Sequence, residues 1–355
     1  ADNNTAVGAS ALLVNSTGAG VTAVGKGALA ANTTGANNTA LGYLAGAANV
    51  DDTENVAIGY AANHPDGGSY VTAVGSQSLN ANTADSNSGI GYLALTANTT
   101  GTANTAVGRS SMAANTTASY GTAVGMTALA NNTTGASNTG VGYNALLVNT
   151  TGAQNTAVGR NALDANTTAA NNVAVGYEAM TANTTGTANV TVGAHSMQAN
   201  TTASNNTAVG YFALAANTTG ASNIAIGYQA LDANTTTNNN TAVGYATLSA
   251  NTAANNVAVG YGALQVNTTG TPNTAVGSYA LVANTTAANN TAVGYGSLDA
   301  TTTGGNNTGV GHDTLGVNTT GVNNTAVGAL ALDANTTADE NTAMGYAALG
   351  ANTTG

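Results

Sequence analysis

The sequence predicts an all-β fold, a parallel β-solenoid, and three observations carry that prediction. The phrase N-T-A-V-G-Y-x-A-L-x-A-N-T-T-G-x-x recurs along all 355 residues. The glycine that follows its valine occurs 21 times, at a spacing of 17 residues in 17 of the 20 intervals and of 16 in the other three. One phrase is too short to bury an apolar face alone, so successive phrases must stack. We therefore predict a single continuous repeat domain, residues 1–355, of 21 coils.

The composition supports a folded chain and excludes several classes of function. Apolar residues make up 43% of the chain and recur at fixed places, which is not typical of disorder. The net charge is −11 and only Lys26, Arg109 and Arg160 are basic, so a nucleic-acid groove is not expected. The absence of cysteine excludes disulfides and thiolate metal sites, and no apolar run is long enough to span a membrane.

Within each phrase, the alternation around the valine and again around the leucine predicts two short strands joined by two turns. Glycine and threonine in every phrase disfavour a helix. The valine position is aliphatic in all 21 copies, so we expect it to face the interior, together with the threonine two residues earlier. The leucine position should close the core from the other side. Expected core residues are Val209, Ile226, Val243, Val276, Leu264 and Leu281.

The residue between that threonine and that valine is Ala in 17 of the 21 copies. The pleat of a strand would then point it outward, where so small a residue suggests that another backbone comes close. We interpret this alanine and the following glycine as an interface stripe, with a tight strand that merely tolerates alanine as the alternative. Its expected members are Ala208, Ala225, Ala242, Ala275, Gly210 and Gly244.

Asparagine and tyrosine recur at fixed positions. Asn opens the phrase in 18 copies and recurs before the T-T pair in 19. Because equivalent asparagines of successive coils would lie next to one another, we expect ladders of turn asparagines along the stack. The second Asn also forms N-x-T sequons, a less favoured reading that makes Asn32, Asn166, Asn217, Asn267 and Asn335 possible glycosylation sites. Tyr follows the V-G pair in 11 copies, and we favour a stabilising aromatic ladder over a sugar-binding stripe for Tyr177, Tyr211, Tyr228, Tyr245 and Tyr261.

Residues for catalysis are sparse. His64, His195 and His312 lie in distant phrases, and the aspartates of "ALDAN" do not form the repeated acidic pattern of calcium-binding β-rolls. The stretch "HPDGG" at 64–68 lacks the lysine of a phosphate loop and predicts a locally bulged coil. We expect no enzyme activity, no catalytic site, no cofactor and no metal.

The strands "NVAIG" at 55–59, "NVAVG" at 172–176 and "NIAIG" at 223–227 resemble the head repeats of YadA-like trimeric autotransporter adhesins. The second half of the phrase, "YxALxANTTG", is more similar to the repeat tracts of tail-fibre-type proteins. The resemblance implies a parallel β-roll at an exposed surface, packed as a trimer and binding host or matrix ligands.

These observations predict a non-enzymatic extracellular fibre, structural or adhesive, at a cell or virion surface. The expected partner is a second copy of the chain, packed laterally or end to end, and a host, matrix or carbohydrate surface is a further one. Neither end of the sequence reads as a capping coil, which favours end-to-end growth. The alternatives are a viral tail-fibre shaft and an ice-binding solenoid. Ice binding requires ranks of outward threonines, whereas the expected faces turn the first threonine inward.

Overall fold

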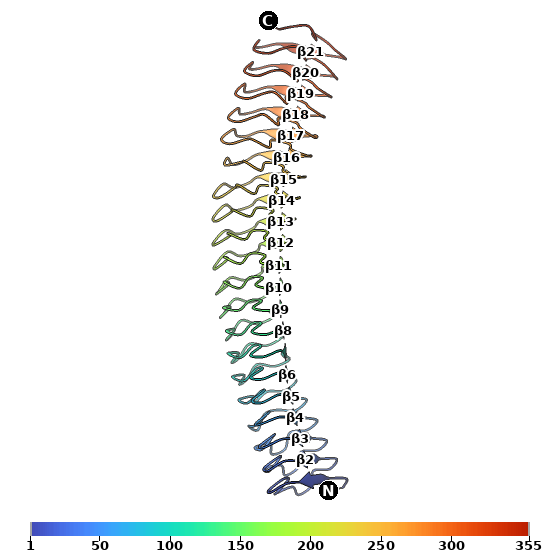
Figure 1. Cartoon of the computed structure of the whole chain (residues 1–355), viewed down its shortest axis with the longest axis vertical. Helices are drawn as coiled ribbons and strands as arrows, with labels where there is room; N and C mark the ends of the chain where they lie inside the picture. The colour runs from blue at the N-terminus through green and yellow to red at the C-terminus, as the bar shows by residue number, and fades with distance from the viewer. Residues whose placement is uncertain (1, 354–355) are drawn as a thin grey trace. The chain divides into compact units, whose positions relative to one another are not determined.

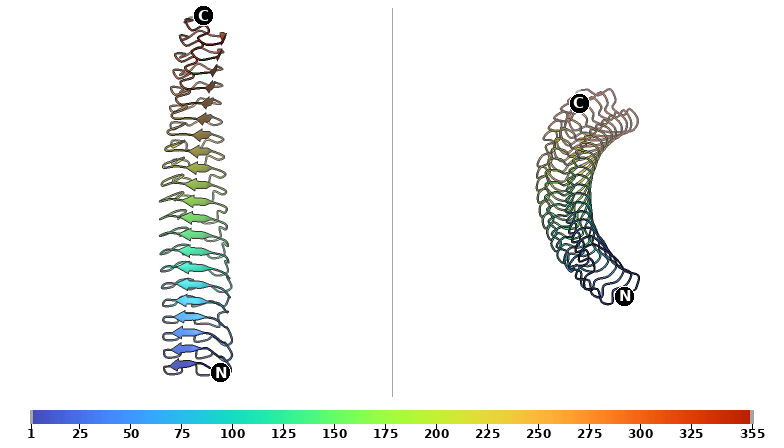
Figure 2. Two further views of the ribbon diagram at one scale, coloured as in Figure 1. Left: turned by 90° about the vertical axis from the view of Figure 1, so that its right-hand side faces the viewer. Right: turned by 60° about the horizontal axis from the view of Figure 1, so that its bottom comes forward.

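The computed structural model describes residues 2–353, which form coils stacked along the chain (Figure 1). The chain divides into two compact units, Ala1–Tyr177 and Glu178–Gly355. Each unit is a parallel β-solenoid, and every coil contributes one strand of three residues whose direction is the same throughout its unit (Figure 2). The 21 parallel strands, the repeat of about 17 residues and the absence of helix among the described residues confirm the predicted fold class.

The strands fall at the T-A-V segment of each phrase. Those of the N-terminal unit are β1 Thr5–Val7, β2 Thr22–Val24, β3 Thr39–Leu41, β4 Val56–Ile58, β5 Thr72–Val74, β6 Ser88–Ile90, β7 Thr105–Val107, β8 Thr122–Val124, β9 Thr139–Val141, β10 Thr156–Val158 and β11 Val173–Val175. Those of the C-terminal unit are β12 Val190–Val192, β13 Thr207–Val209, β14 Ile224–Ile226, β15 Thr241–Val243, β16 Val257–Val259, β17 Thr274–Val276, β18 Thr291–Val293, β19 Thr308–Val310, β20 Thr325–Val327 and β21 Thr342–Met344.

Successive strands within a unit pair in parallel, with equivalent residues opposite one another. In β13 and β14, for example, Ala208 lies opposite Ala225 and Val209 opposite Ile226. The ladder continues past the strand, because the N–H of Gly227 donates to the carbonyl of Val209 at 2.7 Å. Each coil thus satisfies the backbone of the next, which a coil of this length could not do alone.

The predicted second strand of each coil is wrong. The leucine that should lie in it has a left-handed backbone, with φ of 49° at Leu264 and 51° at Leu281, and the residue two places earlier is also left-handed. A left-handed residue cannot continue a strand, so this half of the coil is a pair of tight turns. The turns still bond along the stack, since the N–H of Leu264 donates to Ala280 O at 3.0 Å.

The predicted orientation of the T-A-V strand is also wrong. Ala208, Ala225, Ala242 and Ala275 are fully buried, so they form no interface stripe on the outside. Val209, Ile226, Val243 and Val276 point outward instead and are not core residues. Val209 and Val243 are partly exposed, Ile226 is 38% exposed and Val276 is 37% exposed.

The reason for the reversal is the narrow interior of the coil. At Gly140, which replaces the strand alanine in β9, an added Cβ would lie 3.2 Å from Ala145 O and 3.3 Å from Leu129 Cγ. The space between the strand and the opposite turn is therefore narrow and suits alanine, and the larger Thr191 of β12 fits there with its hydroxyl bonded to Ser196. The predicted inward leucines are confirmed, since Leu264 and Leu281 are fully buried.

The glycine after each strand packs against the next coil and not against another chain. Gly210 has a φ of 135°, and a Cβ added to it would lie 2.5 Å from Gly227 O. Gly244 has a φ of 138° and meets the backbone of Gly260 in the same way. These two residues, predicted to belong to an interface, therefore serve contact between coils within one chain.

Two asparagine ladders inside the solenoid confirm the predicted role of the repeated asparagines. In the first, Asn206 Oδ1 accepts the backbone N–H of Asn223 at 2.9 Å, while its Nδ2 donates to Gly220 O at 3.0 Å. In the second, Asn217 Nδ2 donates to Asn200 Oδ1 at 3.1 Å and to Gly220 O at 2.9 Å. Buried amides are bonded in this way where the neighbouring coils also carry the asparagine, whereas Asn284 Oδ1, which faces the coil with Thr301 in that position, has no partner in the structure.

Candidate functional site

The first and third side chains of each strand form an outward surface, which we call the Thr/Val face. They share one side of the sheet because alternate strand residues point the same way. In β17–β20 the face holds two unbroken columns, one of threonine and one of valine, and every member is uncharged. These columns are Thr274, Thr291, Thr308 and Thr325, and Val276, Val293, Val310 and Val327.

The Thr/Val face offers both hydroxyl and methyl groups to solvent. Val276, Val293 and Val310 are each 37% exposed. Among the described residues, no hydrogen bond within the protein involves the side-chain hydroxyl of Thr274 or Thr291. The sequence reasoning missed this face, because it assigned both columns to the core.

An aromatic row lies beside the strands of the C-terminal unit, made of Tyr211, Tyr228, Tyr245, Tyr261, Tyr279 and Tyr295. Ring centroids of Tyr228 and Tyr245 are 5.0 Å apart with an interplanar angle of 8°, and those of Tyr245 and Tyr261 are 5.0 Å apart at 4°. The predicted aromatic ladder is thus confirmed for Tyr211, Tyr228, Tyr245 and Tyr261. Stacking covers the ring faces that a sugar would need, which supports the stabilising role over a sugar-binding one.

The aromatic row continues through the coil of β17, although that coil lacks a tyrosine directly after its V-G pair. Ser278 occupies the expected tyrosine position, but the next residue, Tyr279, contacts Tyr261 at 5.3 Å and Tyr295 at 6.0 Å, edge to face. Loss of hydration raises the pKa of the Tyr279 phenol, and the neighbouring Tyr261 raises it further. The row ends on His312, whose ring stacks on Tyr295 at 5.3 Å.

In the N-terminal unit the same column combines tyrosines with basic residues. Lys26 Nζ lies 5.8 Å from the ring centroid of Tyr43, and the guanidinium of Arg160 lies 5.5 Å from that of Tyr177. The predicted ladder member Tyr177 therefore lies under a cation, an attractive contact between a positive charge and a ring face.

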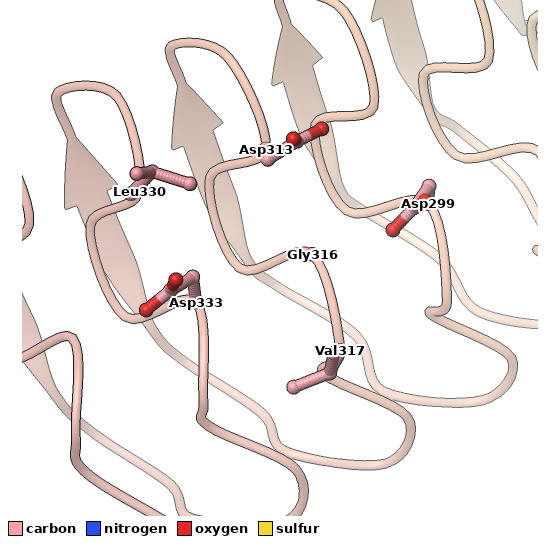
Figure 3. Close-up of a pocket in the computed structure, with 6 residues that line it drawn as sticks. All are labelled: Asp299, Asp313, Gly316, Val317, Leu330 and Asp333. Atoms are coloured by element: carbon pink, nitrogen blue, oxygen red, sulfur yellow. The ribbon is translucent and has the colours of Figure 1, made fainter.

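An acidic cavity of about 270 Å³ lies on three consecutive coils, those of β18, β19 and β20 (Figure 3). Asp299, Asp313 and Asp333 line it together with Gly316, Val317 and Leu330. Burial raises the pKa of Asp299, and the Asp313 carboxylate raises it further. Asp299 Oδ1 is buried without a hydrogen-bond partner in the structure, so the charged form of this carboxyl is poorly solvated.

A second acidic cluster adjoins the "HPDGG" stretch, where Asp51, Asp52 and Asp66 bring carboxylate oxygens within 4.8 Å of one another. Two of the three cap backbone groups, since Asp66 Oδ1 accepts from Val50 N at 3.0 Å and Asp52 Oδ2 from Gly68 N at 2.8 Å. Burial is the main reason that the pKa of Asp52 is raised. These contacts give Asp52 and Asp66 a structural role beside the "HPDGG" stretch.

The histidines lie in separate coils, as the sequence predicted. His195 Nδ1 is 3.5 Å from Glu178 Oε2, and the His195 ring stacks on Phe212 at 5.1 Å. His312 Nδ1 is 3.2 Å from the carboxylate of its neighbour Asp313. His64 belongs to the coil of β4, in the other unit.

The sequon asparagines are not available for glycosylation in the folded chain, which overturns that prediction. Asn32, Asn166, Asn217, Asn267 and Asn335 are all fully buried in the second asparagine ladder. In Asn267, for example, Nδ2 donates to Asn251 Oδ1 at 2.7 Å and to Gly270 O at 3.0 Å. The atom that would carry a sugar is therefore already bonded inside the stack.

Comparison with known proteins assigns no family. No protein-family model matches the chain, and no curated protein matches it either. Within residues 2–353, the structure holds no helix with the length and apolarity needed to cross a bilayer.

Proposed function

We propose that the protein is a non-enzymatic extracellular fibre, structural or adhesive, that works through its outer surfaces. The observation that carries the proposal is the Thr/Val face, an uncharged and partly apolar sheet surface that repeats without change along β17–β20. Ordinary soluble surfaces interrupt such columns with charged side chains. The resemblance to adhesin head repeats and tail-fibre tracts supports a place at a cell or virion surface.

The partner of this face, in our proposal, is a second copy of the chain. Its columns repeat at the coil spacing, about 4.8 Å. A second solenoid of the same sequence has the same spacing, so its valines can meet each valine of the first along the whole face. No charge on the face opposes the contact, and burial of each exposed valine contributes roughly 25 cal/mol per Å² of apolar surface removed from water.

Sedimentation over a range of protein concentrations tests whether the chain self-associates through the Thr/Val face. We expect the unmodified chain to self-associate, and a Val276→Lys/Val293→Lys variant to remain monomeric because two buried ammonium groups would oppose the contact. A matched control is Val266→Lys/Val317→Lys, which changes valines of similar exposure, 41% and 45%, outside the Thr/Val face. A monomer at every concentration would refute self-association, and loss of assembly in the control alone would place the interface elsewhere.

Ice binding is the second candidate, and it is favoured by the outward direction of the strand threonines. Their hydroxyls form a rank with one member per coil, about 4.8 Å apart, beside a rank of valine methyls about 7 Å away along the strand. A rigid, uncharged grid of hydroxyl and methyl groups is the kind of surface that can hold ordered water in a lattice. Ice binding requires ranks of outward threonines on one face, and the strand threonines of β17–β20 meet that requirement.

Thermal hysteresis of the purified protein tests the second candidate. If the Thr/Val face binds ice, Thr291→Lys/Thr308→Lys should lose most of the hysteresis. Thr303→Lys/Thr320→Lys, which alters exposed threonines of the T-T turn, should retain it. Hysteresis that is absent from the unmodified chain would eliminate ice binding and leave the fibre proposal untouched.

A further inference from the structure

We propose that the aromatic row of the C-terminal unit is a site of oxidative cross-linking, where one-electron oxidation joins neighbouring tyrosines by carbon–carbon bonds. The geometry is most favourable at Tyr228, Tyr245 and Tyr261. Consecutive ring centroids there are 5.0 Å apart and the rings are within 8° of parallel. Two phenols in adjacent coils are thus held together before any reaction begins, and proximity of this kind lowers the entropic barrier to coupling.

The three rings are also accessible to an oxidant. Tyr228 is 40% exposed, Tyr245 47% and Tyr261 48%. They stack with one another while their edges remain open to solvent, so an electron can be removed by a reagent that never enters the fold. Because each side chain keeps two rotatable bonds at the surface, the ortho carbons can approach without movement of the backbone.

The reaction we propose uses hydrogen peroxide and a haem peroxidase as the oxidant. Each of two tyrosines loses one electron and its phenolic proton, which leaves a phenoxyl radical with spin density on its ortho carbons. Two ortho carbons then form one carbon–carbon bond, and the hydrogen on each returns to a phenol oxygen as a proton when the ring regains aromaticity. In sum two C–H bonds are broken, and two electrons and two protons reduce one peroxide to two waters.

The product would connect consecutive coils covalently. Tyr228, Tyr245 and Tyr261 follow β14, β15 and β16, and apart from the continuous backbone the coils of those strands are held together by hydrogen bonds and packing. The chain contains no cysteine, so disulfides cannot supply such a link. A tyrosine cross-link would resist the opening of one coil from the next, which is how a stacked array begins to unfold.

The test treats the full chain at low concentration with peroxidase and hydrogen peroxide, followed by cleavage before aspartate and mass spectrometry. Cleavage before Asp232 separates Tyr228, in peptide 164–231, from Tyr245 and Tyr261, in peptide 232–298. We expect dityrosine fluorescence from monomeric protein and a joined pair of these peptides whose mass is lower by two hydrogens. Products that occur only between chains, as dimers that disappear on dilution, would overturn the proposal.

Tyr245→Phe keeps an aromatic ring in the row and removes the oxidisable phenol at its centre. It should abolish the joined peptides and most of the dityrosine fluorescence. The matched control is Tyr143→Phe, since Tyr143 is 42% exposed but the adjacent coils carry Met126 and Arg160 at its position. Dityrosine that is unchanged in Tyr245→Phe, or lost equally in Tyr143→Phe, would show that the row does not direct the coupling.

Discussion

Thr191 and Ser196 form a hydrogen bond between their hydroxyls inside the coil of β12, and both side chains are fully buried. Thr191 takes the place of the strand alanine, and Ser196 takes the place of the alanine opposite it in the turn. The corresponding pair in the next coil is Ala208 and Ala213, also fully buried. One coil has thus replaced two buried alanines with two hydroxyl-bearing residues that bond to each other, as expected for residues that share an interior.

Ser196→Ala should destabilise the coil, because the buried Thr191 hydroxyl loses its partner at a cost of about 1–3 kcal/mol. The double variant Thr191→Ala/Ser196→Ala should be close to the unmodified chain, since it restores the alanine pair. Chemical unfolding followed by circular dichroism measures both. Additive losses in the double variant would contradict the pairing.

Ala242→Arg should be severely destabilising, by at least several kcal/mol, because it places a charge and a long side chain in an interior that accepts a methyl group. Val243→Arg, one residue along the same strand, should change stability by less than about 1 kcal/mol because that side chain points outward. Thermal unfolding of the two variants gives the comparison. Similar effects at the two positions would show that the strand faces are not distinct.

Asn217→Ala should cost roughly 1–3 kcal/mol per buried group left without a partner. The variant removes the donor to Asn200 Oδ1 and the acceptor of Asn234 Nδ2, which lie 3.1 Å and 3.0 Å from Asn217 in the ladder. Thr219→Ala, in the exposed T-T turn of the same coil, is the control and should be neutral within experimental error. Hydrogen exchange at the coils of β13 and β14 should show the loss locally, and uniform protection would argue against a structural ladder.

Asp299→Asn should stabilise the C-terminal unit at neutral pH. The pKa of Asp299 is raised above its ordinary value of 3.8 by burial and by Asp313, so the folded state holds this proton more tightly than the unfolded chain does. Stability associated with this group is therefore present at low pH and lost as the pH rises above 3.8 through the folded pKa. The gain from Asn should be largest near pH 7 and vanish toward pH 3. Unfolding midpoints across this range check it, and a variant that is less stable at pH 7 would contradict it.

Much of the fold follows from the repeat itself. The spacing of glycines fixes the coil length, and identical phrases must stack in register, so the parallel pairing of Ala208 with Ala225 could be predicted. The asparagine ladders and the inward leucines could be predicted in the same way. A residue that recurs at one position of the phrase lies next to the equivalent residue of the preceding and following coils.

The strand faces could not be predicted from the interchange of residues alone. Thr, Val and Ile replace one another at the first strand position, which suggests an apolar interior, yet β-branched residues suit an exposed sheet surface equally well. The small size of Ala242 and its equivalents was the better guide to the direction of the side chains. It indicates a narrow interior and not contact with another chain. The left-handed conformation of Leu264 and Leu281 has no local signature, since bulky residues seldom adopt it unless packing compels them.

The central claim is that threonine and valine of each strand face outward while the alanine between them faces inward, and labelling of single cysteines tests it most directly. The natural chain has no cysteine, so Thr241→Cys, Ala242→Cys and Val243→Cys each introduce one thiol in β15. A maleimide should label Thr241→Cys and Val243→Cys rapidly in the folded protein and Ala242→Cys only after unfolding. Rapid labelling of Ala242→Cys with protection of its two neighbours would contradict the account.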